Sequence, residues 1–287
     1  MSKIKVLLLG QSGMLGNALY ETLNNVAEIN LISTARSNTS ASIFFDANNG
    51  KIYELLNDIR PKYVINSLGY NFNNETDNML QIIKAIKINS IFPRVLANSA
   101  AKLGIRLFQI NTDGVFSGKA GNYLENSFRD ARDVYGISKI LGEVNNQSLL
   151  SLRCSIVGEQ YNASKRKYLA EWFKSQPFDK TIKGYNNLNW NGITVKSFSR
   201  IILGLVQNNS SITGSYHLIP RNVITKYELL NLFKYRFSRY DINIVEATLP
   251  KPVDRSLNTI YPEINNHLWR LGGYNSVPEI SQLITSM

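Results

Sequence analysis

The chain has 287 residues, with little cysteine, histidine or proline and no long apolar segment. Its single cysteine, Cys154, excludes a disulfide within the chain and fits a reducing compartment. The two histidines, His217 and His267, are too few for a histidine-rich metal centre, so we predict no metal site and expect both to be structural or surface residues. No stretch approaches the ~20 apolar residues of a membrane span, and VLLL near the N-terminus is too short for a signal core. These absences predict a cytoplasmic protein without a membrane partner.

The composition supports a substantial core, because 44% of the residues are hydrophobic, in one large or two small domains. A formal net charge of +11 raises the question of nucleic acid, yet the basic residues are spread along the chain and are densest only at Lys165–Lys167. An anionic cofactor and a sugar diphosphate would also be drawn to a basic cleft. We therefore expect small-molecule ligands and no nucleic-acid partner, and a basic nucleic-acid binder is our third-ranked alternative.

The N-terminal segment KIKVLLLG is a continuous apolar run that predicts a buried strand. It leads through glycines at three-residue spacing into a helical stretch, MLGNALYETL. Such glycines allow a sharp turn, let phosphate oxygens approach bare amides and pack the helix on the strand. An ordinary strand-to-helix turn is the alternative interpretation. The predicted dinucleotide-binding residues of this turn are Gly10, Gly13, Met14, Leu15 and Gly16.

Three further predicted strands end in polar or small residues, where an open parallel sheet binds its ligand. The second, INLISTAR, ends in Arg36, whose guanidinium suits the 2′-phosphate of NADPH better than the bare ribose of NADH, although NADH remains possible. A solvated surface arginine is the alternative interpretation. The third strand, SIFFD, and the fourth, YVINSLG, add further predicted cofactor contacts: Asp46, Ala47, Ser67, Leu68 and Gly69.

The most informative stretch is Thr112 to Lys139, which contains the string YGISK. The fifth predicted strand, IRLFQINT, ends at Thr112, and Tyr135 and Lys139 would lie one turn apart on the following helix. With 15 tyrosines, Tyr-x-x-x-Lys also arises by chance, and YNASK at Tyr161 repeats it. Only Tyr135 follows a strand-ending threonine, so we interpret Tyr161 as part of a surface loop.

This spacing predicts a site for hydride transfer. Reducing a ketone requires a hydride at carbon and a proton at oxygen, and a tyrosine with a reference pKa of ~10 releases its proton reluctantly unless its phenolate is stabilised. Lys139 would supply a stabilising positive charge, and Thr112 would orient the carbonyl oxygen. The predicted catalytic residues are thus Tyr135, Lys139 and Thr112, with Tyr135 and Lys139 also contacting the cofactor. A half-exposed helix start with a solvated lysine is the structural alternative.

The glycine spacing points toward the short-chain dehydrogenase/reductase superfamily, and nearly the whole chain resembles its dTDP-4-dehydrorhamnose reductase family. The matching strings, in order, are GQSGMLG, NSLG, KINSIFPRVLA, NTDGVFSG, DVYGISKILGE, LRCSIVG, ITKYELLNLF and DRSLN. The resemblance implies that Tyr135 donates the proton, Lys139 contacts the nicotinamide ribose, Thr112 assists at the sugar carbonyl, and Asp113 with its neighbours approaches the sugar. It also implies a Rossmann-type doubly wound parallel α/β sheet with a small C-terminal substrate-binding lobe.

Two departures from the family pattern affect the substrate. Dehydratases of the superfamily carry Thr-Asp-Glu, whereas this chain has Thr112, Asp113 and Gly114, which favours simple reduction. Gly114 also replaces the tyrosine usual in the reductases, and DRSLN differs from their Arg-Pro segment. We therefore expect a 6-deoxy-4-keto sugar on dTDP or UDP, for a surface polysaccharide precursor, without assigning rhamnose.

We expect residues 1–155, with later segments returning to it, to form the dinucleotide-binding domain and about 156–287 mostly the lobe. Trp190 could stack on a base, although core or lid packing is the favoured interpretation, and Arg255 could meet phosphate or sugar. With Asp113 and Gly114 they complete the predicted substrate-binding set. The alternatives are a non-catalytic NADP-binding regulatory subunit and a nucleotide-sugar epimerase. A homodimer is possible.

Overall fold

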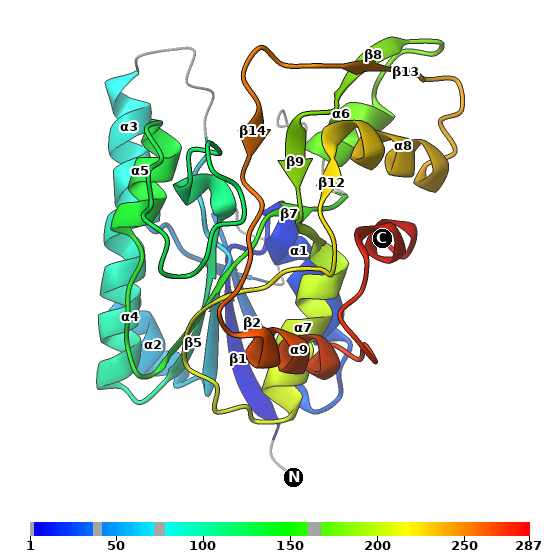
Figure 1. Cartoon of the computed structure of the whole chain (residues 1–287). Coiled ribbons are helices and arrows are strands. Elements are labelled where there is room, and N and C mark those ends of the chain that lie inside the picture. Colours follow the sequence, from blue (N-terminus) through cyan, green and yellow to red (C-terminus); the bar gives the residue numbers. More distant parts are fainter. Residues whose placement is uncertain (1–2, 37–41, 72–77, 160–167) are drawn as a thin grey trace.

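The computed structural model describes residues 3–36, 42–71, 78–159 and 168–287. Its centre is a seven-stranded sheet with the order β11-β6-β5-β4-β1-β2-β3, in which every neighbouring pair is parallel (Figure 1). The strands are β1 (Ile4–Leu9), β2 (Ile29–Ala35), β3 (Ile43–Phe44), β4 (Tyr63–Asn66), β5 (Arg106–Asn111), β6 (Leu149–Arg153) and β11 (Gly214–His217). This confirms the predicted Rossmann-type doubly wound sheet.

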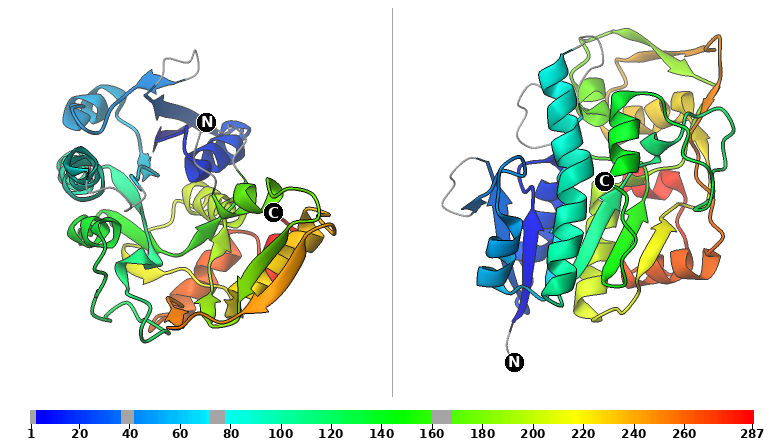
Figure 2. Two further views of the ribbon diagram at one scale, coloured as in Figure 1. Left: turned by 90° about the horizontal axis from the view of Figure 1, so that it is seen from above. Right: turned by 90° about the vertical axis from the view of Figure 1, so that its left-hand side faces the viewer.

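Apolar side chains cover both faces of the sheet. Along β1, Val6 and Leu8 belong to one core cluster and Leu7 and Leu9 to the other, as the two-residue period of a strand requires. Helices lie on both sides of the sheet in the view from above (Figure 2). One side holds α2 (Ile52–Ile59), α3 (Met79–Ala85), α4 (Phe92–Lys102) and α5 (Val134–Leu141), and the other α1 (Met14–Asn24), α7 (Val195–Gln207) and α9 (Pro262–Leu271).

The long helical region before β5 begins at Met79, with Asn78 as its N-cap, and residues 72–77 lie outside the described part of the chain. It is interrupted by a π-helical segment, η1 (Ile86–Ile91), between α3 and α4. Such segments are rare and frequently lie at functional sites. Buried Asn89 lies in its centre, which places a polar amide inside the helical layer.

A smaller lobe lies above the sheet at the upper right of Figure 1. It packs around its own apolar cluster, which includes Phe173, Phe233 and Ile244. Thr225 caps α8 in a capping box with Glu228, as expected for a helix opened by Thr225. The elements of the lobe are α6 (Leu169–Lys174), β8 (Thr181–Tyr185), β9 (Leu188–Trp190), β12 (Ile224–Thr225), α8 (Lys226–Arg236), β13 (Asn243–Ala247), β14 (Val253–Asp254) and α10 (Ile280–Thr285).

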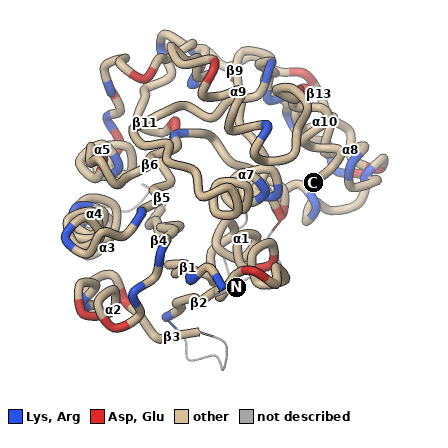
Figure 3. Tube along the Cα trace, turned by 90° about the horizontal axis from the view of Figure 1, so that it is seen from below, with Lys and Arg blue, Asp and Glu red and all other residues tan. Residues whose placement is uncertain are grey.

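The chain crosses between the two regions several times. After β6, the short pair β7 (Ile156–Val157) and β10 (Ile193–Thr194) bridges toward α7, and β11 and α9 then return to the sheet region. Lys and Arg residues are spread over the helices of both regions in the view from below (Figure 3). Among the described residues, no helix is long and apolar enough to cross a membrane.

Candidate active site

The glycine turn joins β1 to α1 with tight backbone packing. Gly10 has φ +93°, which favours glycine, and a Cβ on Gly16 would lie 2.0 Å from the carbonyl oxygen of Gly10. Gly13, Met14 and Leu15 complete the turn and open α1, which has no side-chain cap and no acidic residue in its first turn. Its first amides are therefore free to receive an anion. These features fit the pyrophosphate of a dinucleotide.

The end of β4 lies directly beside this turn, because β1 and β4 are neighbouring strands. The Ser67 hydroxyl donates to the carbonyl oxygen of Leu9 at 2.6 Å, and a Cβ on Gly10 would lie 2.9 Å from Leu68 Cδ2. Gly69 follows, with open space where its Cβ would stand. The order of strands reverses at this point of the sheet, which is where open α/β sheets bind their ligands.

Arg36 and Asp46 lie near each other at the outer edge of the sheet. Arg36 is exposed directly after β2, and Asp46 follows β3 with the partly buried Ala47 beside it. The backbone N–H of Asn48 donates to Asp46 at 3.0 Å and, with the Asn48 side chain and Arg36, holds the pKa of Asp46 below its usual value. The Asp46 carboxylate can therefore accept a hydrogen bond at this edge of the sheet.

Thr112 and Tyr135 meet around Gly114. Thr112 follows β5 and caps the short helix η2 (Asp113–Val115), accepting from the Gly114 N–H at 3.0 Å. A Cβ on Gly114 would lie 3.1 Å from Tyr135 Cε1 and 3.3 Å from Thr112 Oγ1. The Thr112 side chain is near enough to the Tyr135 phenol to act on its pKa, which it lowers against the effect of burial. A side chain at position 114 would therefore crowd both polar groups, which gives this glycine a packing role.

Lys139 lies one turn after Tyr135 on α5 and is buried, with 8% of its surface exposed. Burial lowers the pKa of Lys139 to about 8, and the nearby Glu143 carboxylate opposes that change. Burial raises the pKa of Tyr135 to about 12, and the neighbouring Thr112 side chain opposes that change. In the protein without cofactor, the phenol therefore holds its proton strongly, and the ammonium is ready to lose one.

Polar contacts hold α5 against η1. Asn89 donates to the Ser138 hydroxyl at 3.0 Å and to the carbonyl oxygen of Tyr70 at 2.7 Å. Ser90 donates to the carbonyl oxygen of Ser138 at 2.7 Å, and Ser138 donates to that of Tyr135. The orientation of α5 is thus fixed by buried side chains of η1.

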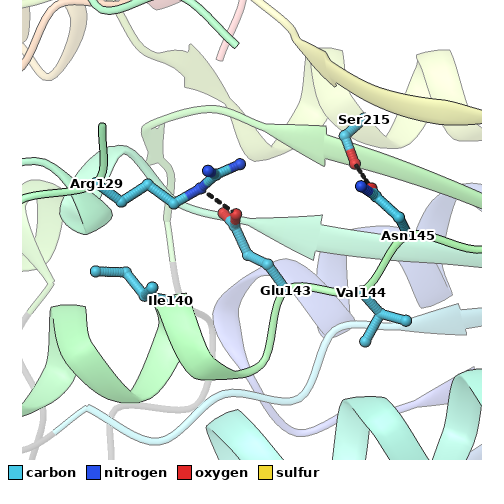
Figure 4. A pocket seen from close by; sticks show the side chains of 6 residues that line it. All are labelled: Arg129, Ile140, Glu143, Val144, Asn145 and Ser215. Carbon is cyan, nitrogen blue, oxygen red and sulfur yellow. Dashed lines mark hydrogen bonds and ion pairs between the residues drawn. The ribbon is translucent and has the colours of Figure 1, made fainter. Parts of the chain in front are cut away.

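A charged network continues beyond the C-terminal end of α5 (Figure 4). Glu143 forms ion pairs with Arg129 and with buried Arg153, beside a pocket of about 240 Å³. Arg153 also contacts His217 Nε2 at 2.6 Å, and the other ring nitrogen contacts the carbonyl oxygen of Asn258 at 2.7 Å. Burial and Arg153 lower the pKa of His217 to about 4. This network is structural and anchors the helix that carries Lys139.

Four side chains gather on the substrate side of Thr112. Thr112 donates to Asp113 Oδ1 at 3.2 Å, and the nearby Ser155 side chain acts to lower the pKa of the same carboxyl group. Trp190 Nε1 donates to Ser155 Oγ at 2.8 Å, which ties β9 of the lobe to the sheet edge. Burial raises the pKa of Asp113, while the Arg255 guanidinium opposes this. Arg255 Nε is itself buried without a partner.

The structure therefore gathers most of the predicted catalytic and substrate residues, namely Thr112, Asp113, Gly114, Tyr135, Arg255 and, through Ser155, Trp190. Lys139 lies one turn further along α5, beside Glu143. The other predicted cofactor residues lie at the ends of β1, β2, β3 and β4 and in the glycine turn.

His217 is buried in the charged network, and His267 is exposed on α9. Within the described residues, no cluster of metal-binding side chains occurs. The repeat motif at Tyr161 and the cluster Lys165–Lys167 lie outside the described residues.

Sequence reasoning missed Ser155 and the anchoring role of Asn89. Ser155 lies two residues beyond the C-terminal end of β6, close to the position of Thr112, which directly follows β5. The sequence did carry a signal for Asn89, because its amide stands at a position that the helical pattern of apolar residues would bury. Cys154 is a free buried thiol, and burial raises its pKa, so it is unreactive.

A family model described as RmlD substrate binding domain matches residues 4–260. Methionine adenosyltransferase 2 subunit beta of Xenopus tropicalis is 25% identical in an alignment of 238 residues that covers 78% of this chain and 70% of that protein. Among solved structures, a dTDP-4-dehydrorhamnose reductase from Bacillus anthracis in complex with NADP has a TM-score of 0.76 and 22% identity, covering 99% of this chain and 98% of that one. A dTDP-4-dehydrorhamnose reductase from Clostridium acetobutylicum has a TM-score of 0.75 and 20% identity, with 98% and 97% covered.

Proposed function

This chain belongs to the RmlD substrate binding domain family, and on that premise we propose that it is an NAD(P)H-dependent reductase. Its substrate would be the 4-keto group of a nucleotide-linked 6-deoxy-4-keto sugar, for a surface polysaccharide precursor. The observation that carries the proposal is the convergence of Tyr135 and Thr112 around Gly114, with buried Lys139 one turn further along α5. The solved relatives named as dTDP-4-dehydrorhamnose reductases share this fold and support the same chemistry.

The residues of the glycine turn would hold the cofactor. The uncapped amides of α1 would receive its pyrophosphate, and exposed Arg36 would favour the 2′-phosphate of NADPH over NADH. The bound cofactor supplies a hydride to the carbonyl carbon. Asp46, with its carboxylate kept ionised by Asn48, would accept from the adenine amino group.

Tyr135 would donate the proton to the carbonyl oxygen of the sugar. Its phenolate is costly in the buried site, as the raised pKa of about 12 shows, so the step needs a stabilising charge. Protonated Lys139 supplies that charge one turn away. Thr112 would orient the carbonyl oxygen through its hydroxyl group. The combined placement of these three side chains gives general acid catalysis at the carbonyl oxygen.

Asp113, Gly114, Trp190 and Arg255 would contact the sugar nucleotide. Arg255 has an unpartnered buried Nε close to Asp113, which suits a hydroxyl or phosphate oxygen of the ligand. Trp190 is committed through Nε1 to Ser155, so only its ring is free to pack against a ligand. Gly114 packs closely against Tyr135, since even a Cβ would lie 3.1 Å from the Tyr135 ring, so this chain has no room for the larger side chain that the reductases carry at this position. This difference supports a sugar other than rhamnose.

The test is oxidation of NADPH, followed at 340 nm, on addition of 4-keto-6-deoxy sugars linked to dTDP or UDP. We expect turnover with at least one member of the panel and none with the corresponding sugars that lack the keto group. The absence of turnover with every member, in protein that binds NADPH, would contradict the proposal.

A second candidate is a non-catalytic nucleotide-binding subunit. The specific observation that favours it is the similarity to a protein named as the beta subunit of methionine adenosyltransferase 2. The candidates make different predictions, because a regulatory subunit would bind NADPH without consuming it and would co-purify with a catalytic partner. Tight NADPH binding by calorimetry, with no turnover across the panel, would favour this candidate.

A further inference from the structure

The hydroxyl group of Thr112 has one proton and three polar neighbours. It accepts from the Gly114 N–H at 3.0 Å and donates to Asp113 Oδ1 at 3.2 Å. The Tyr135 hydroxyl is its third neighbour. Because a threonine hydroxyl donates only once, the proton given to Asp113 is not available to any other acceptor.

Asp113 lies among groups that hold it in place from several elements. The Ser155 hydroxyl acts to lower the pKa of the Asp113 carboxyl group, and because Ser155 Oγ already accepts from Trp190 at 2.8 Å, its own proton is free to be donated toward that carboxylate. Arg255, which follows β14, supplies the positive charge nearest to the carboxylate. The other titratable groups facing Asp113 are Tyr135 on α5 and the thiol of Cys154 after β6.

Two arrangements of these protons are possible. When Asp113 is ionised, it takes the Thr112 proton, and Thr112 can only accept from Tyr135. When Asp113 is protonated, it donates to Thr112 Oγ1, and the Thr112 proton is free for an acceptor in the site. Only the second arrangement lets Thr112 donate to a carbonyl oxygen.

We propose that Asp113 is a positioning residue that sets the direction of the Thr112 hydroxyl proton and so decides whether Thr112 can donate to the carbonyl oxygen of the substrate. The inference rests on the proposed function, because it deepens the role of Thr112 there. The two arrangements differ by one proton, which the Asp113 carboxylate takes up from solvent or releases to it, and no other covalent bond changes. The proton that Tyr135 gives to the sugar is not involved. Burial, which favours the neutral carboxyl group, makes the donating arrangement accessible.

The first test measures the carboxyl group directly and needs no substrate. In protein labelled with ¹³C at aspartate Cγ, the Asp113 signal is assigned by its loss in Asp113→Asn and titrated by NMR. Thr112→Val and Ser155→Ala each remove a donor to the carboxylate, so each should raise the pKa of Asp113. The signal of exposed Asp58 on α2, which lies outside the site, serves as the internal control. An unchanged Asp113 pKa in Thr112→Val would overturn the proposal.

The second test follows turnover against pH. In the native protein, kcat/KM should fall on the order of 100-fold as Asp113 ionises, the scale for losing one donor to a developing oxyanion. This decline should move to higher pH in Ser155→Ala, by the same shift that NMR records, and should vanish in Asp113→Asn. If Asp113 had only a structural role, Asp113→Asn would lower kcat/KM equally at every pH, and that result would also overturn the proposal.

The two tests separate this inference from the proposed function. If the native protein turns over no member of the panel, the proposed function fails, yet the NMR titration still decides whether Thr112 donates to Asp113. If turnover is present and its pH dependence does not follow the Asp113 titration, only the inference fails. Asp58→Asn, which removes one exposed negative charge, is the matched control and should leave the pH profile unchanged.

Discussion

The cofactor half of the candidate site is formed mainly by backbone groups, whereas the substrate half is formed mainly by side chains. At the ends of β1 and β4, the glycine turn and Ser67 shape the site mainly with backbone, through close approaches such as Gly16 to Gly10. Around Tyr135, side chains from β5, α5, β9 and the segment after β14 converge on one carboxylate and one phenol. The first half depends on a short stretch of chain, and the second depends on how the lobe docks onto the sheet.

This difference determines what each half can tolerate. A backbone site loses function when a Cβ fills it, whereas a side-chain site loses function when one donor or charge is removed. If the two halves are energetically separate, substitutions in one should leave binding to the other intact. Five variants test this separation, in order of decreasing expected effect.

Tyr135→Phe should have the largest effect, a loss of roughly 10²–10⁴-fold in kcat, because it removes the proton donor while preserving the ring. NADPH binding should stay within about two-fold of native, since the phenol does not shape the cofactor half. Stopped-flow turnover and calorimetric NADPH titration measure the two effects. Tyr123→Phe, a buried tyrosine of a neighbouring loop, is the matched control and should retain kcat. Full activity in Tyr135→Phe would show that Tyr135 is not the proton donor.

Lys139→Met should abolish most turnover and yet stabilise the folded protein at pH 7. The folded state binds the Lys139 proton more weakly than the unfolded state, because burial lowers its pKa from 10.5 to about 8. Protonated Lys139 therefore lowers stability fully below pH 8, and this cost disappears between pH 8 and 10.5. The gain from the substitution should be about 3 kcal/mol at pH 7.

Urea unfolding of this variant at pH 7 and at pH 10 checks both the sign and the window. The gain should shrink at the higher pH. Lys102→Met, on the exposed end of α4, should change neither stability nor turnover. A loss of stability in Lys139→Met at pH 7 would show that its contacts outweigh the cost of burying its charge.

Gly16→Ala and Gly136→Ala form a matched pair across the two halves. A Cβ on Gly16 would lie 2.0 Å from the Gly10 carbonyl oxygen, and a Cβ on Gly136 would lie 2.6 Å from that of Gly114. Each should destabilise the protein by about 1–3 kcal/mol through overpacking. Gly16→Ala should lose NADPH affinity, whereas Gly136→Ala should keep it and lose kcat. Equal loss of NADPH affinity in both variants would show that the two halves are coupled.

The same contrast explains what the sequence could predict. The glycine turn, Thr112 at a strand end and the Tyr135–Lys139 spacing are each local patterns, and the order of strands along the chain places them at one sheet edge. The chain of contacts from Trp190 through Ser155 to Asp113 was not predictable, because it joins residues that only lobe docking brings together. The packing role of Gly114 was missed for the same reason, since its neighbour Tyr135 belongs to another element.

Arg36→Asp should have the smallest effect and acts at the outer edge of the cofactor half. Arg36 is exposed, so its contact with a 2′-phosphate is partly screened by solvent, and its loss should shift the NADPH/NADH preference by roughly ten-fold, about 1.4 kcal/mol. The introduced carboxylate would repel the phosphate and accept from the ribose hydroxyl, which adds to the shift toward NADH. Steady-state kcat/KM for both cofactors measures this ratio, with Arg270→Asp on α9 as the charge-matched control. Because Arg36 lies far along the sheet from Tyr135, kcat with saturating NADH should equal the native value, and a fall in kcat would mean that the adenosine edge and the catalytic centre are energetically linked.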